Sequence, residues 1–91
     1  MRVRWTSDAA ADLSRIVERI RAENPKSALH VARTIYNSIA DLKKFPKRGR
    51  IGLVENTREL VFAPWPYLAV YEIVEDQIQV LRIRHASRNW P

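Results

Sequence analysis

The chain has no cysteine among its 91 residues. Disulfides and thiolate metal sites are therefore excluded, and a folded state has to be held together by its core. A lack of cysteine is typical of proteins from a reducing compartment, so we expect a cytoplasmic protein. Glycine occurs only twice, which leaves few positions for backbone conformations that other residues resist.

Long hydrophobic runs are also absent. The longest apolar stretch, residues 60–71, is interrupted by Pro64 and Pro66 and is shorter than the ~20 residues that span a bilayer. The first residues lack the hydrophobic region of a signal peptide, so we expect neither a membrane span nor a leader. With 46% apolar residues, residues 1–91 are predicted to form one domain around one modest core.

Acidic residues are scarce relative to basic ones. Sixteen Lys and Arg stand against ten Asp and Glu, which gives a net charge of +6. The excess gathers between Lys43 and Arg58, where Glu55 is the one acid, and again from Arg82 onward, where there is none. Such clusters attract nucleic acid or acidic protein segments. A membrane surface is disfavoured because no predicted helix combines a basic face with bulky aromatic residues on the other.

The first half of the chain predicts a short strand at residues 2–5 and then two helices. Thr6 or Ser7 can cap the first helix, in which apolar residues recur from Ala9 to Ile20 at helical spacing. Asn24 followed by Pro25 is typical of a helix start, and Pro46 ends the second helix. So short a connection predicts an antiparallel helix hairpin. We expect the second helix to bury Ala28, Val31, Ala32, Ile35, Ile39 and Leu42.

The second half predicts three strands, at residues 58–63, 67–74 and 78–85, after a basic loop at residues 47–57. Short connections between these strands indicate an antiparallel meander, with the helix hairpin on one face. This is an α+β fold. In the last strand, alternation places Arg82 and Arg84 on one face with Ile78 and Val80. Leu81, Ile83 and His85 are expected on the other.

Element order and several short motifs resemble the RelE/ParE superfamily of toxins from bacterial type II toxin–antitoxin modules. The motifs run through the whole chain: Asp12-Leu13, Asn24-Pro25, Phe45-Pro46 with Gly49-Arg50, Thr57-Arg58-Glu59-Leu60 and Pro66-Tyr67. The ending, Val80-Leu81-Arg82-Ile83-Arg84-His85-Ala86-Ser87-Arg88-Asn89-Trp90-Pro91, is similar to plasmid-stabilisation toxins of the ParE-like branch. The resemblance implies a β-α-α-β-β-β fold, no cofactor and no metal.

The resemblance implies two possible activities. RelE-type toxins cleave messenger RNA on the ribosome, whereas ParE-type toxins poison DNA gyrase and have no established catalysis of their own. If the chain is RelE-like, Arg58 and Arg82 match phosphate-binding positions and His85 matches a proton-transfer position. Ala86 stands where cleaving relatives usually have a tyrosine. We therefore favour the ParE-like activity, with RNA cleavage as the alternative.

Binding of a target or of an acidic antitoxin is expected to use basic residues and the last aromatic residue. These candidates are Lys47, Arg48, Arg50, Arg58, Arg84, Arg88 and Trp90. A purely structural interpretation stays open for several of them: Arg58 can pair with Glu72 or Glu55, and His85 can bond a backbone carbonyl. A non-toxic basic interaction domain is the third functional hypothesis.

Overall fold

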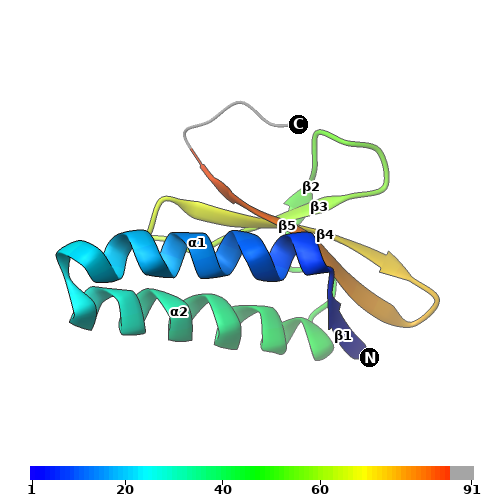
Figure 1. Cartoon of the computed structure of the whole chain (residues 1–91). Coiled ribbons are helices and arrows are strands. Elements are labelled where there is room, and N and C mark those ends of the chain that lie inside the picture. The colour runs from blue at the N-terminus through cyan, green and yellow to red at the C-terminus, as the bar shows by residue number, and fades with distance from the viewer. Residues whose placement is uncertain (87–91) are drawn as a thin grey trace.

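The computed structural model describes residues 1–86 and has the predicted α+β architecture, with two helices on one side of a sheet (Figure 1). Neither helix within these residues is long and apolar enough to cross a membrane. In chain order the elements are β1 (Arg2–Trp5), α1 (Ser7–Glu23), α2 (Pro25–Ala40), the 3-10 helix η1 (Asp41–Lys43), β2 (Arg50–Ile51), β3 (Arg58–Val61), β4 (Tyr67–Val74) and β5 (Gln77–His85).

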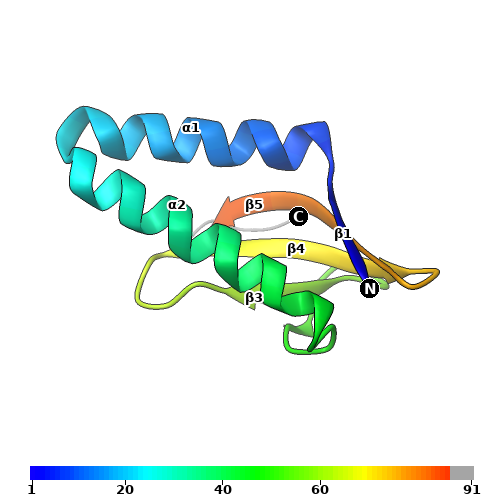
Figure 2. The same cartoon turned by 90° about the horizontal axis from the view of Figure 1, so that it is seen from below.

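Side-chain caps start both helices, as the sequence predicts. The hydroxyl of Thr6 accepts a hydrogen bond from the Ala9 N–H at 3.0 Å and donates one to the Leu81 carbonyl at 2.9 Å. The first bond satisfies a backbone donor of α1, and the second ties the start of α1 to β5. Asn24 caps α2 by accepting from the Ser27 N–H at 3.2 Å. The two helices form the expected hairpin (Figure 2).

The sheet has five strands in the order β1-β5-β4-β3-β2. The meander of β3, β4 and β5 is antiparallel, as predicted. Two features were not predicted. β1 pairs with β5 in parallel, so the sheet is mixed rather than wholly antiparallel. β2 is a two-residue strand inside the predicted basic loop and pairs with the start of β3; two residues are too few to give an alternating pattern.

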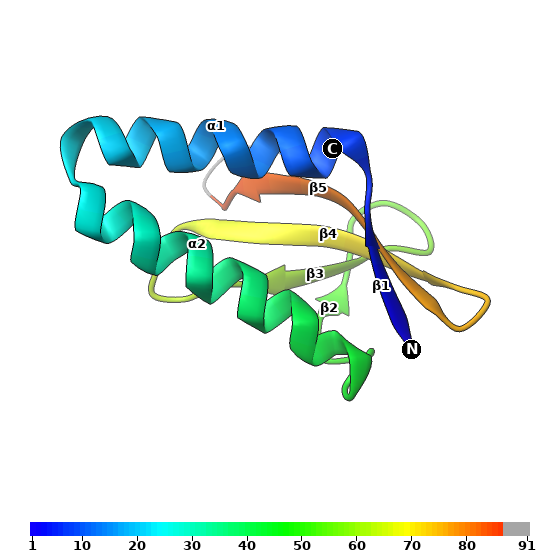
Figure 3. The ribbon, with the colours of Figure 1, turned by 60° about the horizontal axis from the view of Figure 1, so that its bottom comes forward.

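The helix hairpin covers one face of the sheet, and the core lies between the two layers (Figure 3). Val31, Ile35 and Ile39 of α2 are buried there, and Leu42 of η1 continues this stripe beyond the helix. The sheet contributes a second set of buried side chains to the same core: Leu60, Phe62, Tyr67, Ala69, Tyr71, Ile78, Val80 and Ile83. Of the residues predicted to be buried on α2, Ala32 is only half-buried.

A bulge in β5 overturns the predicted alternation of the last strand. Val80 lies opposite Tyr71 on β4, but Arg82 lies opposite Val70, so Leu81 is one residue extra. An inserted residue shifts the strand by one position and exchanges the faces beyond it. Ile83 therefore joins Ile78 and Val80 on the helix-covered face. Arg82 and Arg84 lie opposite Val70 and Leu68 instead, and from this open strand edge both side chains still reach the side of α1.

Candidate functional site

Asp12 is a buried carboxylate that clamps α1 to the end of β5. Its Oδ2 accepts hydrogen bonds from Arg82 Nε at 2.8 Å and from the Ile83 N–H at 3.0 Å. Its Oδ1 accepts from Nη2 of Arg82 at 3.0 Å and from Nη2 of Arg15 at 2.7 Å. Within residues 1–86, β1 pairs with β5 only as far as Val80, so the clamp supplies an acceptor to a strand edge that no strand of this part of the chain covers.

The charges around Asp12 perturb both partners. Burial alone would raise the pKa of Asp12, but the hydrogen bonds from Arg82 and the Ile83 N–H outweigh burial and hold the pKa below its ordinary value. The same hydrogen bond raises the pKa of Arg82. Both groups are therefore charged at neutral pH, and the guanidinium of Arg82 is already engaged in an ion pair with two hydrogen bonds.

A small polar pocket of about 180 Å³ opens beside this clamp. Arg84, His85 and Tyr67 line it from the sheet, and Arg15 and Arg19 line it from α1. The His85 and Tyr67 rings meet edge to face with centroids 5.5 Å apart. Burial and the nearby positive charge of Arg82 lower the pKa of Arg84. Asp12 lines the pocket as well, but three arginines from two elements outnumber this one carboxylate, so the pocket suits a small anionic group.

Arg58 lies elsewhere, on β3 opposite the middle of β4. It pairs with Tyr71, whereas His85 pairs with Tyr67, so the two are separated by about 13 Å along the strand direction alone. Arg58 Nη1 donates to the carbonyls of Gly49 at 2.7 Å and Lys47 at 3.3 Å. These carbonyls are its recorded partners, in place of the ion pair with Glu72 or Glu55 that was left open.

The segment that Arg58 holds is the basic segment, which we define as residues 43–50. Tyr71 fixes it from below: the hydroxyl accepts from the Gly49 N–H at 2.9 Å and donates to the Pro46 carbonyl at 2.7 Å. A Cβ on Gly49 would lie 2.7 Å from the Tyr71 ring, so only glycine allows this approach. The basic segment is therefore a loop held in one conformation.

Buried Glu59 fixes the end of the basic segment. Its carboxylate accepts from Arg50 Nε at 3.0 Å and pairs with Nη2 of the same arginine at 2.9 Å. Glu59 is 5% exposed and lies opposite Val70, on the sheet face away from the helices. Removing Arg50 would leave a buried carboxylate without its cation, so Arg50 has a structural role whether or not it also binds a partner.

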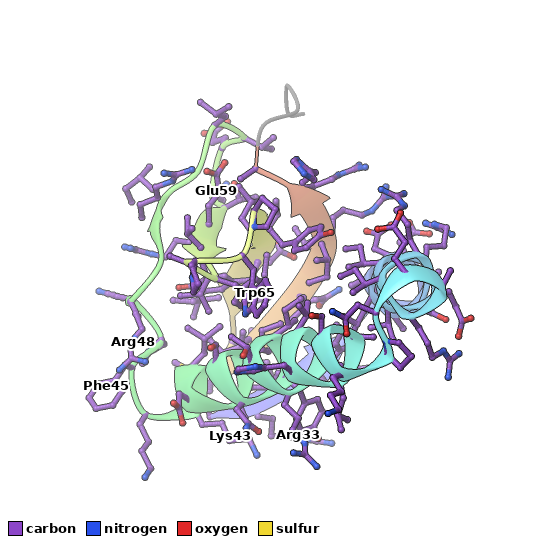
Figure 4. All side chains as sticks on the ribbon, turned by 90° about the vertical axis from the view of Figure 1, so that its left-hand side faces the viewer. Arg33, Lys43, Phe45, Arg48, Glu59 and Trp65 are labelled. Carbon is purple, nitrogen blue, oxygen red and sulfur yellow. The ribbon has the colours of Figure 1, made fainter. Side chains whose placement is uncertain are left out.

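At the outer edge of the basic segment, Phe45 and Arg48 lie side by side (Figure 4). The Arg48 guanidinium carbon is 4.8 Å from the centre of the Phe45 ring, a cation–π contact. Phe45 is 54% exposed. Together with Pro46 and Lys47 the pair lines an open groove of about 460 Å³.

The predicted site residues thus divide into two groups. Arg84 and His85 line the polar pocket, with Arg82 bound to Asp12 beside it. A second group surrounds or holds the basic segment: Lys47, Arg48, Arg50 and Arg58. Arg88 and Trp90 lie outside the described residues. Arg58, Arg82 and Arg84 therefore do not form one common anion-binding site.

Sequence reasoning missed three side chains that organise these two places: Asp12 as a clamp, Tyr71 as a tether and Glu59 as the partner of Arg50. A polar residue on the apolar stripe of the first helix was the available signal for Asp12. Tyr71 and Glu59 gave no comparable signal, because their partners are brought close only by pairing of the strands.

The chain matches the model of one protein family over residues 3–90, the ParE toxin of the type II toxin–antitoxin system parDE. It belongs to this family. Among curated proteins it is 37% identical over 90 residues to a candidate toxin, Y4kP, of Sinorhizobium fredii, covering 99% of this chain and 93% of the relative. It is also 36% identical over 84 residues to toxin RelE2 of Caulobacter vibrioides, covering 92% and 93%.

Solved structures agree with the family. The chain is similar to one in the chromosomal ParDE toxin–antitoxin system of P. aeruginosa, with a TM-score of 0.88, 30% identity and coverage of 96% of this chain and 97% of that one. It also resembles a chain of the E. coli RelBE toxin–antitoxin complex, with a TM-score of 0.66 at 11% identity over 96% and 98%. The second match shows the shared fold alone. The chain is thus a type II toxin, and the ParE-like interpretation is favoured.

Proposed function

We propose that this ParE-family toxin stops growth by acting on DNA gyrase, and that a cognate antitoxin neutralises it. One observation carries the choice of gyrase over RNA cleavage: the groups expected to cleave RNA are not assembled. The guanidinium of Arg82 is bound to Asp12, and Arg58 pairs with β4 four residues further along than His85 does, about 13 Å away along the strand. Cleavage needs the proton-transfer histidine and the phosphate-binding arginines within reach of the same phosphate.

Induced expression, with replication and translation followed separately, tests the target. Trapped gyrase–DNA breaks and an early halt in DNA synthesis are the expected results. Cuts in translated messages that keep the codon phase, with replication unaffected at first, would contradict the proposal. Harmless expression without an antitoxin would contradict any toxin activity of this chain.

RNA cleavage stays the second candidate because of the polar pocket. His85, Tyr67 and Arg84 lie within it, and a histidine beside a cation can transfer a proton near a phosphate. His85→Gln distinguishes the two activities. A gyrase poison should keep most of its toxicity in this variant, whereas a nuclease that uses His85 should lose about 10²-fold or more in cleavage rate.

For the antitoxin, an apolar groove of about 380 Å³ offers the best fit. Trp5, Leu13, Val17 and Tyr36 line it, with α1 along one side, and Tyr36 is 62% exposed. We expect apolar side chains of an antitoxin helix or extended segment to occupy this groove. Its acidic residues would pair with the positive surface of the toxin.

Attraction between the positive toxin and an acidic antitoxin should make their association fast and dependent on salt concentration. Stopped-flow mixing at increasing ionic strength measures this effect, with a fall in the association rate as the expected result. A rate that is independent of salt would contradict the electrostatic account. Leu13→Asp should weaken the complex by acting on the groove itself, mainly through a faster dissociation rate.

A further inference from the structure

The basic segment carries exposed lysines that are not paired with acidic side chains elsewhere in residues 1–86. Lys43, Lys44 and Lys47 are all exposed. Within the described residues, none of these lysine ammonium groups takes part in an ion pair that the structure records. Arg48 reaches Asp41 only at 4.0 Å. Positive charge is therefore concentrated where little within the chain neutralises it.

An exposed aromatic ring lies among these charges. Phe45 follows Lys44 in the chain and carries Arg48 against its ring. A large apolar side chain that is 54% exposed in a loop contributes little to the core. An aromatic surface flanked by cations is the arrangement with which proteins stack an unpaired base while binding its phosphates.

The conformation of the basic segment is set before any ligand arrives. Tyr71 and Arg58 make four hydrogen bonds to the backbone of residues 46–49, at 2.7 to 3.3 Å. Leu42, fully buried, anchors the start of the segment in the core. A loop fixed in this way loses little conformational entropy on binding, which favours affinity.

We propose that the basic segment binds single-stranded nucleic acid, with a base stacked on Phe45 and the neighbouring phosphates on Lys44, Lys47 and Arg48. Duplex is disfavoured because its bases are already stacked on one another and do not offer a free face. An acidic peptide would form ion pairs with the lysines but would offer no base to stack on Phe45. This inference goes beyond action on gyrase and does not depend on it.

Fluorescence anisotropy with the full chain and a labelled oligothymidine of about 12 nucleotides tests the proposal, since known sites span ~4–16 nucleotides. Phe45→Ala should weaken binding about five-fold or more, the loss of one stacked base. Leu29→Ala is the matched control, because Leu29 on α2 is an apolar residue that is also 54% exposed. It should leave binding unchanged.

A second pair of variants tests the charges. Lys44→Gln with Lys47→Gln should reduce the slope of log K against log salt by about 1.4, the loss of two phosphate contacts. Lys26→Gln with Arg33→Gln removes the same charge from α2, where Arg33 projects away from Phe45 (Figure 4). This control should keep nearly the full slope. All four positions are exposed, so the variants should fold.

Three results would overturn the proposal. One is the absence of saturable binding to the oligothymidine at low salt. Another is an equal loss of affinity in the two charge pairs, which would mean attraction to the overall charge. The third is competition by a glutamate peptide of equal charge that is as strong as competition by unlabelled oligothymidine and is insensitive to Phe45→Ala.

Discussion

The arginines beside the polar pocket and the cations of the basic segment carry the same charge in opposite surroundings. Arg82 is 28% exposed and bound to a carboxylate that is 7% exposed, and together they fasten a helix to a strand. Lys47 and Arg48 are exposed on a segment that other residues hold in place. A positive charge in this fold therefore contributes to stability at one place and is available for a partner at the other.

The two regions also differ in which groups accept the hydrogen bonds. At the end of β5, the donors converge on one carboxylate, Asp12. At the basic segment, Tyr71 and Arg58 bind backbone atoms and leave the neighbouring lysine side chains out of the contacts. Variants that separate fold stability from binding should therefore give opposite results in the two regions.

The largest expected loss of stability comes from Asp12→Ala. The variant leaves Arg82 without its carboxylate and the Ile83 N–H without its acceptor, so the free energy of unfolding should fall by about 2–3 kcal/mol. Urea denaturation measures this as a lower midpoint at an unchanged slope. Arg15→Gln is the control: Arg15 bonds the same carboxylate but is 65% exposed, so its loss should cost under about 1 kcal/mol.

Tyr71→Phe comes next, because it deletes one hydroxyl and keeps the ring. Gly49 N–H and the Pro46 carbonyl both lose their partner, and we expect a loss of about 2 kcal/mol. Hydrogen exchange should also speed up at residue 49 more than at strand amides outside this contact. Tyr36→Phe, at an exposed tyrosine, should change neither quantity. Unchanged exchange at residue 49 would mean that the hydroxyl does not hold the basic segment.

The two regions could be predicted from sequence to different extents. The helix caps at Thr6 and Asn24 depend on neighbouring residues, and the structure has them as expected. The bulge at Leu81 was not predictable, because it depends on pairing with β4. Because of the bulge, Ile83 and not Arg82 follows Val80 on the helix-covered face, so the predicted grouping of Arg82 with Ile78 and Val80 is wrong.

Long-range pairs account for the rest of what the sequence did not reveal. Asp12 and Arg82 are 70 residues apart in the chain, and Tyr71 is 25 residues from Pro46. A local pattern contains no information about which polar side chains meet across layers. Charge clustering in the basic segment was visible because its members are neighbours in the sequence.

Lowering the pH should destabilise the Asp12 clamp by a smaller amount than these substitutions do. The pKa of Asp12 lies below its ordinary value, so the carboxylate stabilises the fold above about pH 4 and this stability is lost as the pH falls through the lowered pKa. In Asp12→Asn this contribution is absent at every pH. The difference in unfolding free energy between the natural chain and the variant should therefore shrink from pH 7 toward pH 2. A constant difference would contradict the role of the charge.

The smallest effect on stability is expected at the basic segment. Lys47→Gln removes an exposed side chain that takes part in none of the ion pairs within residues 1–86, so the free energy of unfolding should change by less than about 0.5 kcal/mol. Stability and binding are then measured on the same protein. If the variant keeps its denaturation midpoint and loses affinity for the oligothymidine, the charge acts on a partner. A fall in the midpoint comparable to that of Asp12→Ala would mean that this lysine, too, belongs to the internal scaffold, and the contrast between the two regions would be lost.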